Sequence, residues 1–298
     1  MAIAYVRTPF RLLEAVSPRL SARLARKFFT TPRRWPTPAW EQEIARGAEK
    51  IRLANGHAGL SWGHGRPVLL VHGWEGRVTQ LGRFVAPLVA RGFRVIGFDA
   101  PGHGEQPGKA LTVLQYAQFL RGVIAEYGPL HGVIGHSMGA SALAFAAARH
   151  LRVERAVLIS IANSVGGVVA RFEELLGLGA ETRRIFRRRL ETEIFRTPLA
   201  ELDLSEHMPP FLPQTLLVAT DDDRDVPVSD TQQVAAHWPK ARMQIVLQAG
   251  GHRKLLRDAR TIEAAVGFIA EEFWLPRAAQ PQTAEPTGDQ EAARSVSL

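Results

Sequence analysis

Val133-Ile134-Gly135-His136-Ser137-Met138-Gly139-Ala140-Ser141-Ala142 joins a short β-branched segment to an alanine-rich stretch. Alanine is the strongest helix former, so we expect the chain to change from strand to helix at Ser137. Gly135 and Gly139 give a G-x-S-x-G pattern, which lets strand and helix approach a sharply turned serine. The stretch predicts a nucleophile elbow that exposes Ser137 Oγ. The N–H of Met138, at the start of the helix, is then expected to face a developing oxyanion.

The composition is that of an ordinary globular protein. The chain has 298 residues, of which 46% are hydrophobic and 22% charged, enough for one large α/β domain or for a domain with an inserted subdomain, and we expect one domain. It has no cysteine, which excludes disulfides, thiolate nucleophiles and cysteine metal sites. We find no apolar run of membrane-spanning length and no secretory signal pattern, so a cytoplasmic location is expected.

The positive charge is concentrated near the N-terminus. The net charge is +8, and residues 1–53 hold eleven Lys and Arg against four Glu. A basic segment can bind phosphate or anionic lipid, but no nucleic-acid-binding motif accompanies it, so no nucleic-acid partner is expected.

Apolar residues at helical spacing alternate with these basic residues, and Pro18 divides the pattern into two short helices. The apolar positions are Phe10, Leu13, Leu20, Leu24 and Phe28. We favour helices packed on the domain surface, with weak association of residues 1–40 with an anionic membrane as the alternative. Residues 1–52 are thus assigned to a basic helical extension, which includes a proline-rich connector at 31–38 and a short helix at 39–50.

Short apolar strands then alternate with helical segments, which predicts parallel pairing with helices on both faces of a twisted sheet. Weakly alternating residues 53–62 suggest antiparallel edge strands. The expected buried strands are 67–71, 94–98, 132–134, 155–159, 215–219 and 243–247, and the expected helices are 79–91, 111–127, 137–150, 229–237 and 256–274. The core therefore comprises residues 53–162 and 214–275.

Residues 163–213 interrupt the alternation and show helical patterns of their own. The interval is too long for an ordinary connection, so we assign it to an inserted helical cap. The basic run from Arg183 to Arg189 has nearby glutamates, which favours a solvated helix face over an anion site. Residues 276–298 contain few apolar side chains, and we expect a disordered tail.

Serine needs a base and a group that orients the base. His252 follows the last predicted strand on a glycine-rich loop, which makes it the candidate base. The strand before it ends in Asp221-Asp222-Asp223-Arg224-Asp225, so four carboxylates are candidates for the third group.

The order serine, acid, histidine is similar to the α/β-hydrolase superfamily over roughly residues 66–274. Val71-His72-Gly73-Trp74 and Asp99-Ala100-Pro101-Gly102-His103-Gly104 also resemble its motifs. In that family the acid commonly stands in D-x-x-V-P, which selects Asp223 with Asp225 as runner-up. The resemblance further implies that the N–H of Trp74 is the second oxyanion donor and that no cofactor is required. Gln106 departs from the serine that many relatives carry there.

The remaining histidines near these motifs have structural expectations. His136 is assigned to packing, and His72 and His103 are expected to hold loops through hydrogen bonds. No carboxylate accompanies them at ligand spacing, so no metal site is expected.

The resemblance implies a serine hydrolase that cleaves a carboxylic ester or thioester of small-molecule size through an acyl-enzyme. Ser137 is the expected nucleophile, His252 the base and Asp223 its partner. Acyl transfer, carbon–carbon bond hydrolysis and a non-catalytic, membrane-associated binding protein remain open alternatives. The apolar residues of the cap suggest a pocket for medium acyl chains rather than acetate.

Overall fold

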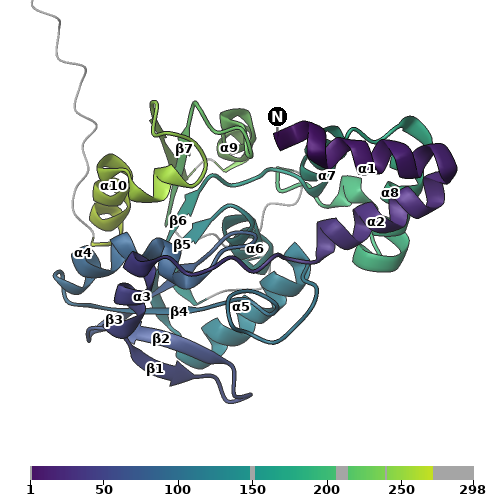
Figure 1. Ribbon diagram of the computed structural model, residues 1–298. Coiled ribbons are helices and arrows are strands. Elements are labelled where there is room, and N and C mark those ends of the chain that lie inside the picture. Colours follow the sequence, from purple (N-terminus) through teal and green to yellow (C-terminus); the bar gives the residue numbers. More distant parts are fainter. Residues whose placement is uncertain (1, 148–151, 206–213, 239, 271–298) are drawn as a thin grey trace, which may run out of the picture.

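The computed structural model describes residues 2–147, 152–205, 214–238 and 240–270. At its centre is an eight-stranded sheet with the order β1-β2-β4-β3-β5-β6-β7-β8 (Figure 1). The strands are β1 (Glu49–Arg52), β2 (Ala58–Trp62), β3 (Arg66–Val71), β4 (Phe93–Phe98), β5 (Leu130–His136), β6 (Val153–Ile159), β7 (Gln214–Thr220) and β8 (Ala241–Val246). Strands β3 to β8 pair in parallel, whereas β1–β2 and β2–β4 pair antiparallel. The predicted mostly parallel sheet is confirmed.

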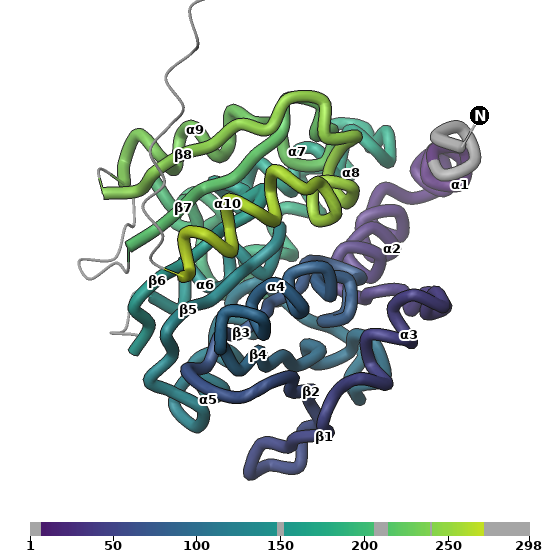
Figure 2. Tube along the Cα trace, turned by 90° about the vertical axis from the view of Figure 1, so that its left-hand side faces the viewer, coloured from purple at the N-terminus to yellow at the C-terminus, as the bar shows by residue number. Residues whose placement is uncertain are grey.

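Alternate residues of the central strands enter two separate hydrophobic clusters. Leu69 and Val71 of β3 join one cluster, and Val68 and Leu70 join the other. Helices α5 (Val113–Tyr127), α6 (Met138–Ala147) and α9 (Val228–His237) cover the first face. The second face carries the 3-10 helix η1 (Val78–Phe84), α4 (Val85–Val89) and α10 (Ala259–Ile269), of which Figure 2 shows α4 and α10 in front of the strands. Both faces are therefore covered by helices, as predicted.

The first edge strand begins earlier than expected. A helix through residue 50 was expected, but α3 (Ala39–Arg46) ends at Arg46 and β1 begins at Glu49. Ile51 is buried while its neighbours Lys50 and Arg52 are exposed, and β1 pairs with β2 along its whole length. Tertiary pairing thus overrides a weak local helical pattern, and β1 lies inside the range assigned to the N-terminal extension.

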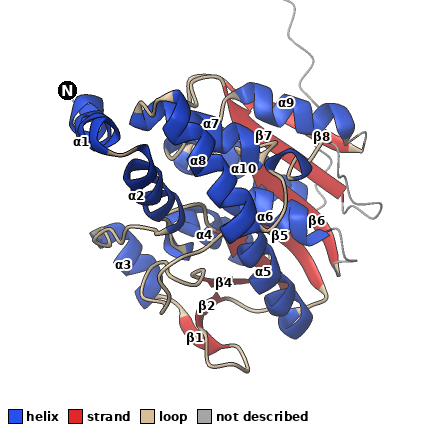
Figure 3. Cartoon of the chain, turned by 90° about the vertical axis from the view of Figure 1, so that its right-hand side faces the viewer, coloured by secondary structure: helices blue, strands red, loops and turns tan. Residues whose placement is uncertain are grey.

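The N-terminal helices pack on the helices of the range assigned to the cap. Helices α1 (Ala2–Val16) and α2 (Pro18–Thr30) lie beside α7 (Val165–Leu176) and α8 (Ala180–Arg189), apart from the sheet (Figures 1 and 3). The Phe29 ring contacts the rings of Phe172 and Phe186, with centroids 5.2 and 5.8 Å apart. Polar contacts join the same helices: the guanidinium of Arg7 donates to the carbonyl of Glu174 at 2.8 Å.

Shorter helices complete the cap and the C-terminal part. The cap continues through η2 (Leu190–Phe195) and η3 (Leu199–Glu201), and η4 (Lys254–Arg257) precedes α10. Residues 206–213 of the predicted cap, the end of the predicted last helix and the predicted tail at 276–298 lie outside the described residues. Among the helices described here, none is long and apolar enough to cross a bilayer.

Candidate active site

Ser137 occupies the turn between β5 and α6. Its φ of 53° lies in the left-handed region, which costs energy for a serine. The Ser137 N–H donates to the carbonyl of Ile159 at 2.8 Å, which fixes the turn against β6. A Cβ at Gly139 would overlap the carbonyl oxygens of Val71 and His72, so glycine is needed for α6 to meet the end of β3. The predicted strand-to-helix turn is therefore present, with Ser137 partly exposed.

Two backbone N–H groups lie near the serine. Met138 is the first residue of α6, where N–H groups have no partner within the helix. The loop after β3 passes close to the serine, since a Cβ at Gly73 would stand 2.9 Å from Ser137 Cβ. Trp74 follows in that loop. Within the described part of the chain, neither the Met138 nor the Trp74 N–H donates a hydrogen bond, so both remain available for an oxyanion.

His252 and Asp223 form a hydrogen-bonded pair. The distance from His252 Nδ1 to Asp223 Oδ2 is 2.7 Å, and Asp223 is only 7% exposed. Burial tends to raise the pKa of Asp223, but hydrogen bonds from His252, the Val226 N–H and the Ser160 hydroxyl prevail, and the pKa lies below its usual value. Because an ionised carboxylate only accepts hydrogen bonds, Nδ1 carries a proton and donates to Asp223, and Nε2 is the ring nitrogen that does not face the carboxylate.

The other three carboxylates of the aspartate run have different positions. Asp221 Oδ1 accepts from the Gln248 N–H at 2.7 Å, and Asp222 Oδ2 accepts from the Gly250 N–H at 2.8 Å. Asp225 has an exposed side chain and donates its own backbone N–H to Asp223. Three consecutive aspartates, 221, 222 and 223, thus accept hydrogen bonds from residues 248, 250 and 252 respectively, in the loop that carries His252. We call these three pairs the aspartate ladder; sequence analysis did not reveal it.

The loop that carries His252 lies beside the turn at Ser137, and His136 contacts this loop. The His136 ring lies 4.5 Å from the His252 ring, and its Nε2 is 3.1 Å from the His252 carbonyl oxygen. Burial lowers the pKa of His136 well below its usual value, so the ring is neutral and Nε2 donates. Among the described residues no hydrogen bond joins Ser137 to His252, and such bonds often tighten only when substrate binds. His136, assigned to packing alone, also supports the histidine loop.

His72 and His103 hold the neighbouring loops. His72 Nδ1 donates to the Gly73 carbonyl and Nε2 accepts from the Ala100 N–H, both at 2.8 Å. Burial lowers the pKa of His72 to about 4, and burial also lowers the pKa of His103 to about 4. The His103 ring meets the Trp74 ring edge-on at 5.3 Å. Both imidazoles are therefore neutral at pH 7 and act through their hydrogen bonds and packing.

Glu75, next to Trp74, is bound by the proline-rich connector. Its carboxylate accepts from the Arg33 Nε at 2.8 Å, from the Arg33 Nη2 at 3.1 Å and from the Trp35 Nε1 at 3.0 Å. Burial would raise the pKa of Glu75, but these hydrogen bonds hold it below its usual value. Glu75 is 8% exposed and has a φ of 55°. The connector therefore holds the loop that carries Trp74, which the sequence did not predict.

The described residues include no cluster of three or more His, Asp or Glu side chains arranged to bind a metal ion.

Comparisons with known proteins support the same family. Residues 68–265 match the model of the Alpha/beta hydrolase family. A non-heme haloperoxidase of Rhodococcus erythropolis is 40% identical over 103 residues, which are 33% of this chain and 38% of that protein. A serine hydrolase-like protein of Danio rerio is 35% identical over 109 residues, 34% of this chain and 33% of that protein. The chain thus spans 33 to 38% of the length of these relatives.

Solved structures share the fold. A membrane phospholipase A described as a bacterial virulence factor has a TM-score of 0.58 and 22% identity, covering 78% of this chain and 88% of that one. An esterase of Pyrococcus furiosus has a TM-score of 0.57 and 16% identity, covering 81% and 96%. The thioesterase domain of the curacin biosynthetic pathway has a TM-score of 0.54 and 19% identity, covering 74% and 98%.

Proposed function

This chain belongs to the alpha/beta hydrolase family, and on that basis we propose that it is a serine hydrolase that cleaves a carboxylic ester or thioester. The observation that carries the proposal is the 2.7 Å hydrogen bond from His252 Nδ1 to the buried Asp223 carboxylate, beside a serine on a strained strand-to-helix turn. A histidine oriented in this way presents Nε2 as a base. Serine hydroxyls need such a base to act as nucleophiles at neutral pH.

In the proposed reaction, Ser137 Oγ attacks the acyl carbon and its proton moves to His252 Nε2. Asp223 keeps the imidazole oriented and offsets the positive charge that the imidazolium carries. The N–H groups of Met138 and Trp74 donate to the oxyanion. His252 then returns the proton to the leaving oxygen or sulfur, which departs and leaves an acyl-enzyme. Water, deprotonated by His252, hydrolyses that ester and restores Ser137.

The acyl group is proposed to be apolar, with support from partly buried Trp74 and Met138 beside the serine. The cap contributes less than its sequence suggests, because Phe172 and Phe186 pack against Phe29 of α2. A series of p-nitrophenyl esters from acetate to decanoate tests this point. Specificity constants that fall steadily from acetate onward would count against an apolar acyl site.

We further propose that residues 1–40 associate weakly with an anionic membrane surface. Its support is the excess of Lys and Arg over Glu in this segment. Each exposed cation contributes about 1 kcal/mol near an anionic bilayer, and salt weakens the attraction.

A fluorophosphonate probe tests the nucleophile. The probe is expected to label the wild-type chain at Ser137, and Ser137→Ala is expected to lose the label. Ser141→Ala, one helical turn away, is the matched control and is expected to keep it. Labelling that persists in Ser137→Ala refutes the assignment, and absence of turnover across a broad ester and thioester panel favours a non-catalytic binding protein.

A further inference from the structure

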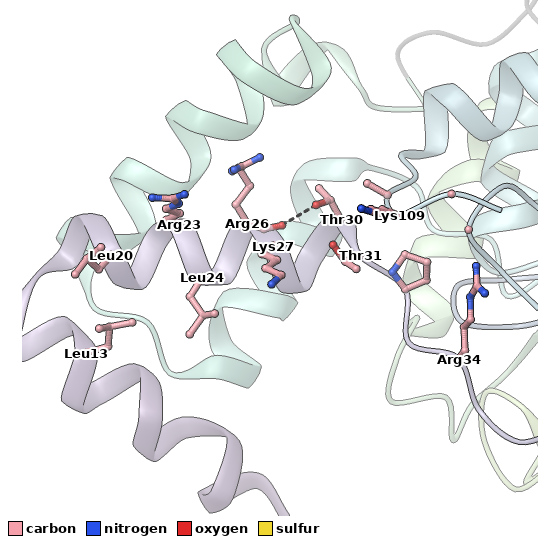
Figure 4. A pocket seen from close by; sticks show the side chains of 14 residues that line it. Leu13, Leu20, Arg23, Leu24, Arg26, Lys27, Thr30, Thr31, Arg34 and Lys109 are labelled. Atoms are coloured by element: carbon pink, nitrogen blue, oxygen red, sulfur yellow. Dashed lines mark hydrogen bonds between the residues drawn. The ribbon is translucent and has the colours of Figure 1, made fainter.

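A groove of about 850 Å³ lies along α2, and neither Ser137 nor His252 lines it. Figure 4 shows Leu13, Leu20 and Leu24 toward one end and Arg34 and Lys109 toward the other. Lys27 lies between them on α2. The far wall is formed by residues 108–110 of the loop that precedes α5. The groove thus has leucines toward one end, where Arg23 also lies, and the cations Arg34 and Lys109 toward the other.

Four of the five cations that line the groove form no ion pair within the described residues, and Arg26 is the exception. None of the described residues that line it is Asp or Glu. Arg26 lies 3.7 Å from Glu193, but Lys27 and Lys109 are exposed and form no ion pair within the described residues. Arg34 donates to a neutral group, the Gln106 carbonyl, at 2.6 Å. An anion is the charge-complementary ligand for this end of the groove.

The helices that form the groove also expose large apolar side chains. Leu12 and Val16 of α1 are 66% and 81% exposed, and Leu20 and Phe28 of α2 are 49% and 50% exposed. These are four of the eight large hydrophobic residues that the described chain exposes. Leu12 and Val16 are one helical turn apart and so share a face. Apolar side chains beside unpaired cations are typical of a helix that lies in a membrane interface.

We propose that α1 and α2 dock on a bilayer and that the groove holds the phosphate of an anionic phospholipid between Lys27, Arg34 and Lys109. The exposed Leu12, Val16, Leu20 and Phe28 enter the interface beside it. A nucleic acid would use the cations but not the aliphatic side chains. The proposal rests on the membrane association proposed above and names its site. It does not depend on the reaction at Ser137.

Vesicle flotation of the full chain tests the site, with Ser137→Ala as background so that vesicle lipid stays intact. Vesicles of phosphatidylcholine with 30% phosphatidylglycerol are compared with phosphatidylcholine alone. We expect binding to the first to be at least tenfold stronger. Lys27→Gln with Lys109→Gln is expected to weaken it about 30-fold, since each cation near an anionic surface contributes about fivefold. Lys50→Gln with Lys240→Gln removes the same charge elsewhere and is expected to change it less than threefold.

A second pair of variants separates membrane insertion from charge. Leu12→Ser with Val16→Ser is expected to reduce binding to both vesicle types at least tenfold. Circular dichroism melting shows whether each variant remains folded. Equal losses for the two charge pairs would overturn the groove as the site. Tight binding of free glycerol phosphate, or binding of an oligonucleotide that Leu12→Ser with Val16→Ser leaves intact, would overturn a bilayer phospholipid as the occupant.

Turnover of a soluble p-nitrophenyl ester by the chain with Ser137 present is measured alongside. Vesicle binding without turnover would contradict the proposed reaction but support the groove as a lipid site. Turnover without vesicle binding would contradict the groove as a lipid site but support the reaction.

Discussion

Arg33 and Glu75, 42 residues apart in the chain, form an ion pair with two side-chain hydrogen bonds of 2.8 and 3.1 Å. Arg33 belongs to the connector that follows α2, and Glu75 follows the proposed oxyanion donor Trp74. The N-terminal extension is thus joined, at a buried carboxylate, to the loop that carries Trp74.

The first prediction follows from that contact. Glu75→Ala is expected to lower kcat about 100-fold with little change in KM, because a displaced Trp74 N–H stabilises only the transition state, and loss of one such donor costs roughly 10²- to 10³-fold. The Gln side chain of Glu75→Gln still accepts hydrogen bonds, so the kcat of this variant is expected to lie between those of the wild type and Glu75→Ala. Glu181→Ala, from the exposed pair with Arg184, is the control. A loss of activity that matches the loss of folded protein would argue for a purely structural role.

The choice between Asp223 and Asp225 is tested by substitution. Asp223→Asn is expected to lower kcat about 10³- to 10⁴-fold, because an amide in its place favours the wrong tautomer of His252. Asp225→Asn is expected to change kcat less than threefold, since its side chain is exposed and only its backbone N–H contacts Asp223. Steady-state kinetics with one p-nitrophenyl ester decides the question, and the reverse ranking would show that Asp225 is the acid.

The hydrogen bonds of the aspartate ladder are predicted to keep the loop that carries His252 ordered. Asp222→Ala removes the acceptor of the Gly250 N–H, and we expect kcat to fall about tenfold as the His252 loop loosens. Hydrogen exchange should show faster exchange at Gly250 while α5 keeps its protection. Unchanged exchange at Gly250 would mean that the ladder does not hold the loop.

The lowered pKa values of His72 and His103 predict how the free energy of unfolding depends on pH. Their folded pKa values of about 4 lie below the ordinary value of 6.5. Between these values the unfolded chain binds protons that the folded chain excludes, so stability falls as pH falls from about 6.5 to 4. At pH 4.5 each contributes a loss on the order of 2 to 3 kcal/mol. In urea unfolding, the free energy of unfolding of His103→Gln should decline less steeply with falling pH than that of the wild type. The control, exposed His237→Gln, should decline as steeply as the wild type.

Substituting each of two adjacent phenylalanines, Phe28 and Phe29, compares the stability contributed by an exposed ring with that contributed by a ring packed on the cap. Phe29→Ala is expected to lower the free energy of unfolding by about 2 to 4 kcal/mol, because its ring packs against Phe172 and Phe186. Phe28 is 50% exposed, so Phe28→Ala should cost less than about 1.5 kcal/mol. Chemical denaturation measures both, and equal losses would mean that Phe29 does not anchor the extension to the cap.

The sequence predicted the features that depend on neighbours in the chain. The turn at Ser137 follows from glycines and alanines within ten residues, and the parallel sheet follows from alternating strands and helices. The contacts it missed join distant residues. Arg33 binds Glu75 across 42 residues, and Asp222 reaches Gly250 across 28. No local pattern records such pairings, and β1 was missed because its partner β2, rather than its own propensity, makes it a strand.

The packing of Phe29 on Phe186 also has a consequence for biosynthesis. The two rings lie 157 positions apart, so at roughly 5 to 20 residues per second a ribosome needs about 8 to 30 s between them. During that interval α2 has left the exit tunnel and its partner does not yet exist. The apolar face of the first thirty residues is then open to chaperones or to a nearby bilayer, and the core between extension and cap closes only after most of the sheet has been translated.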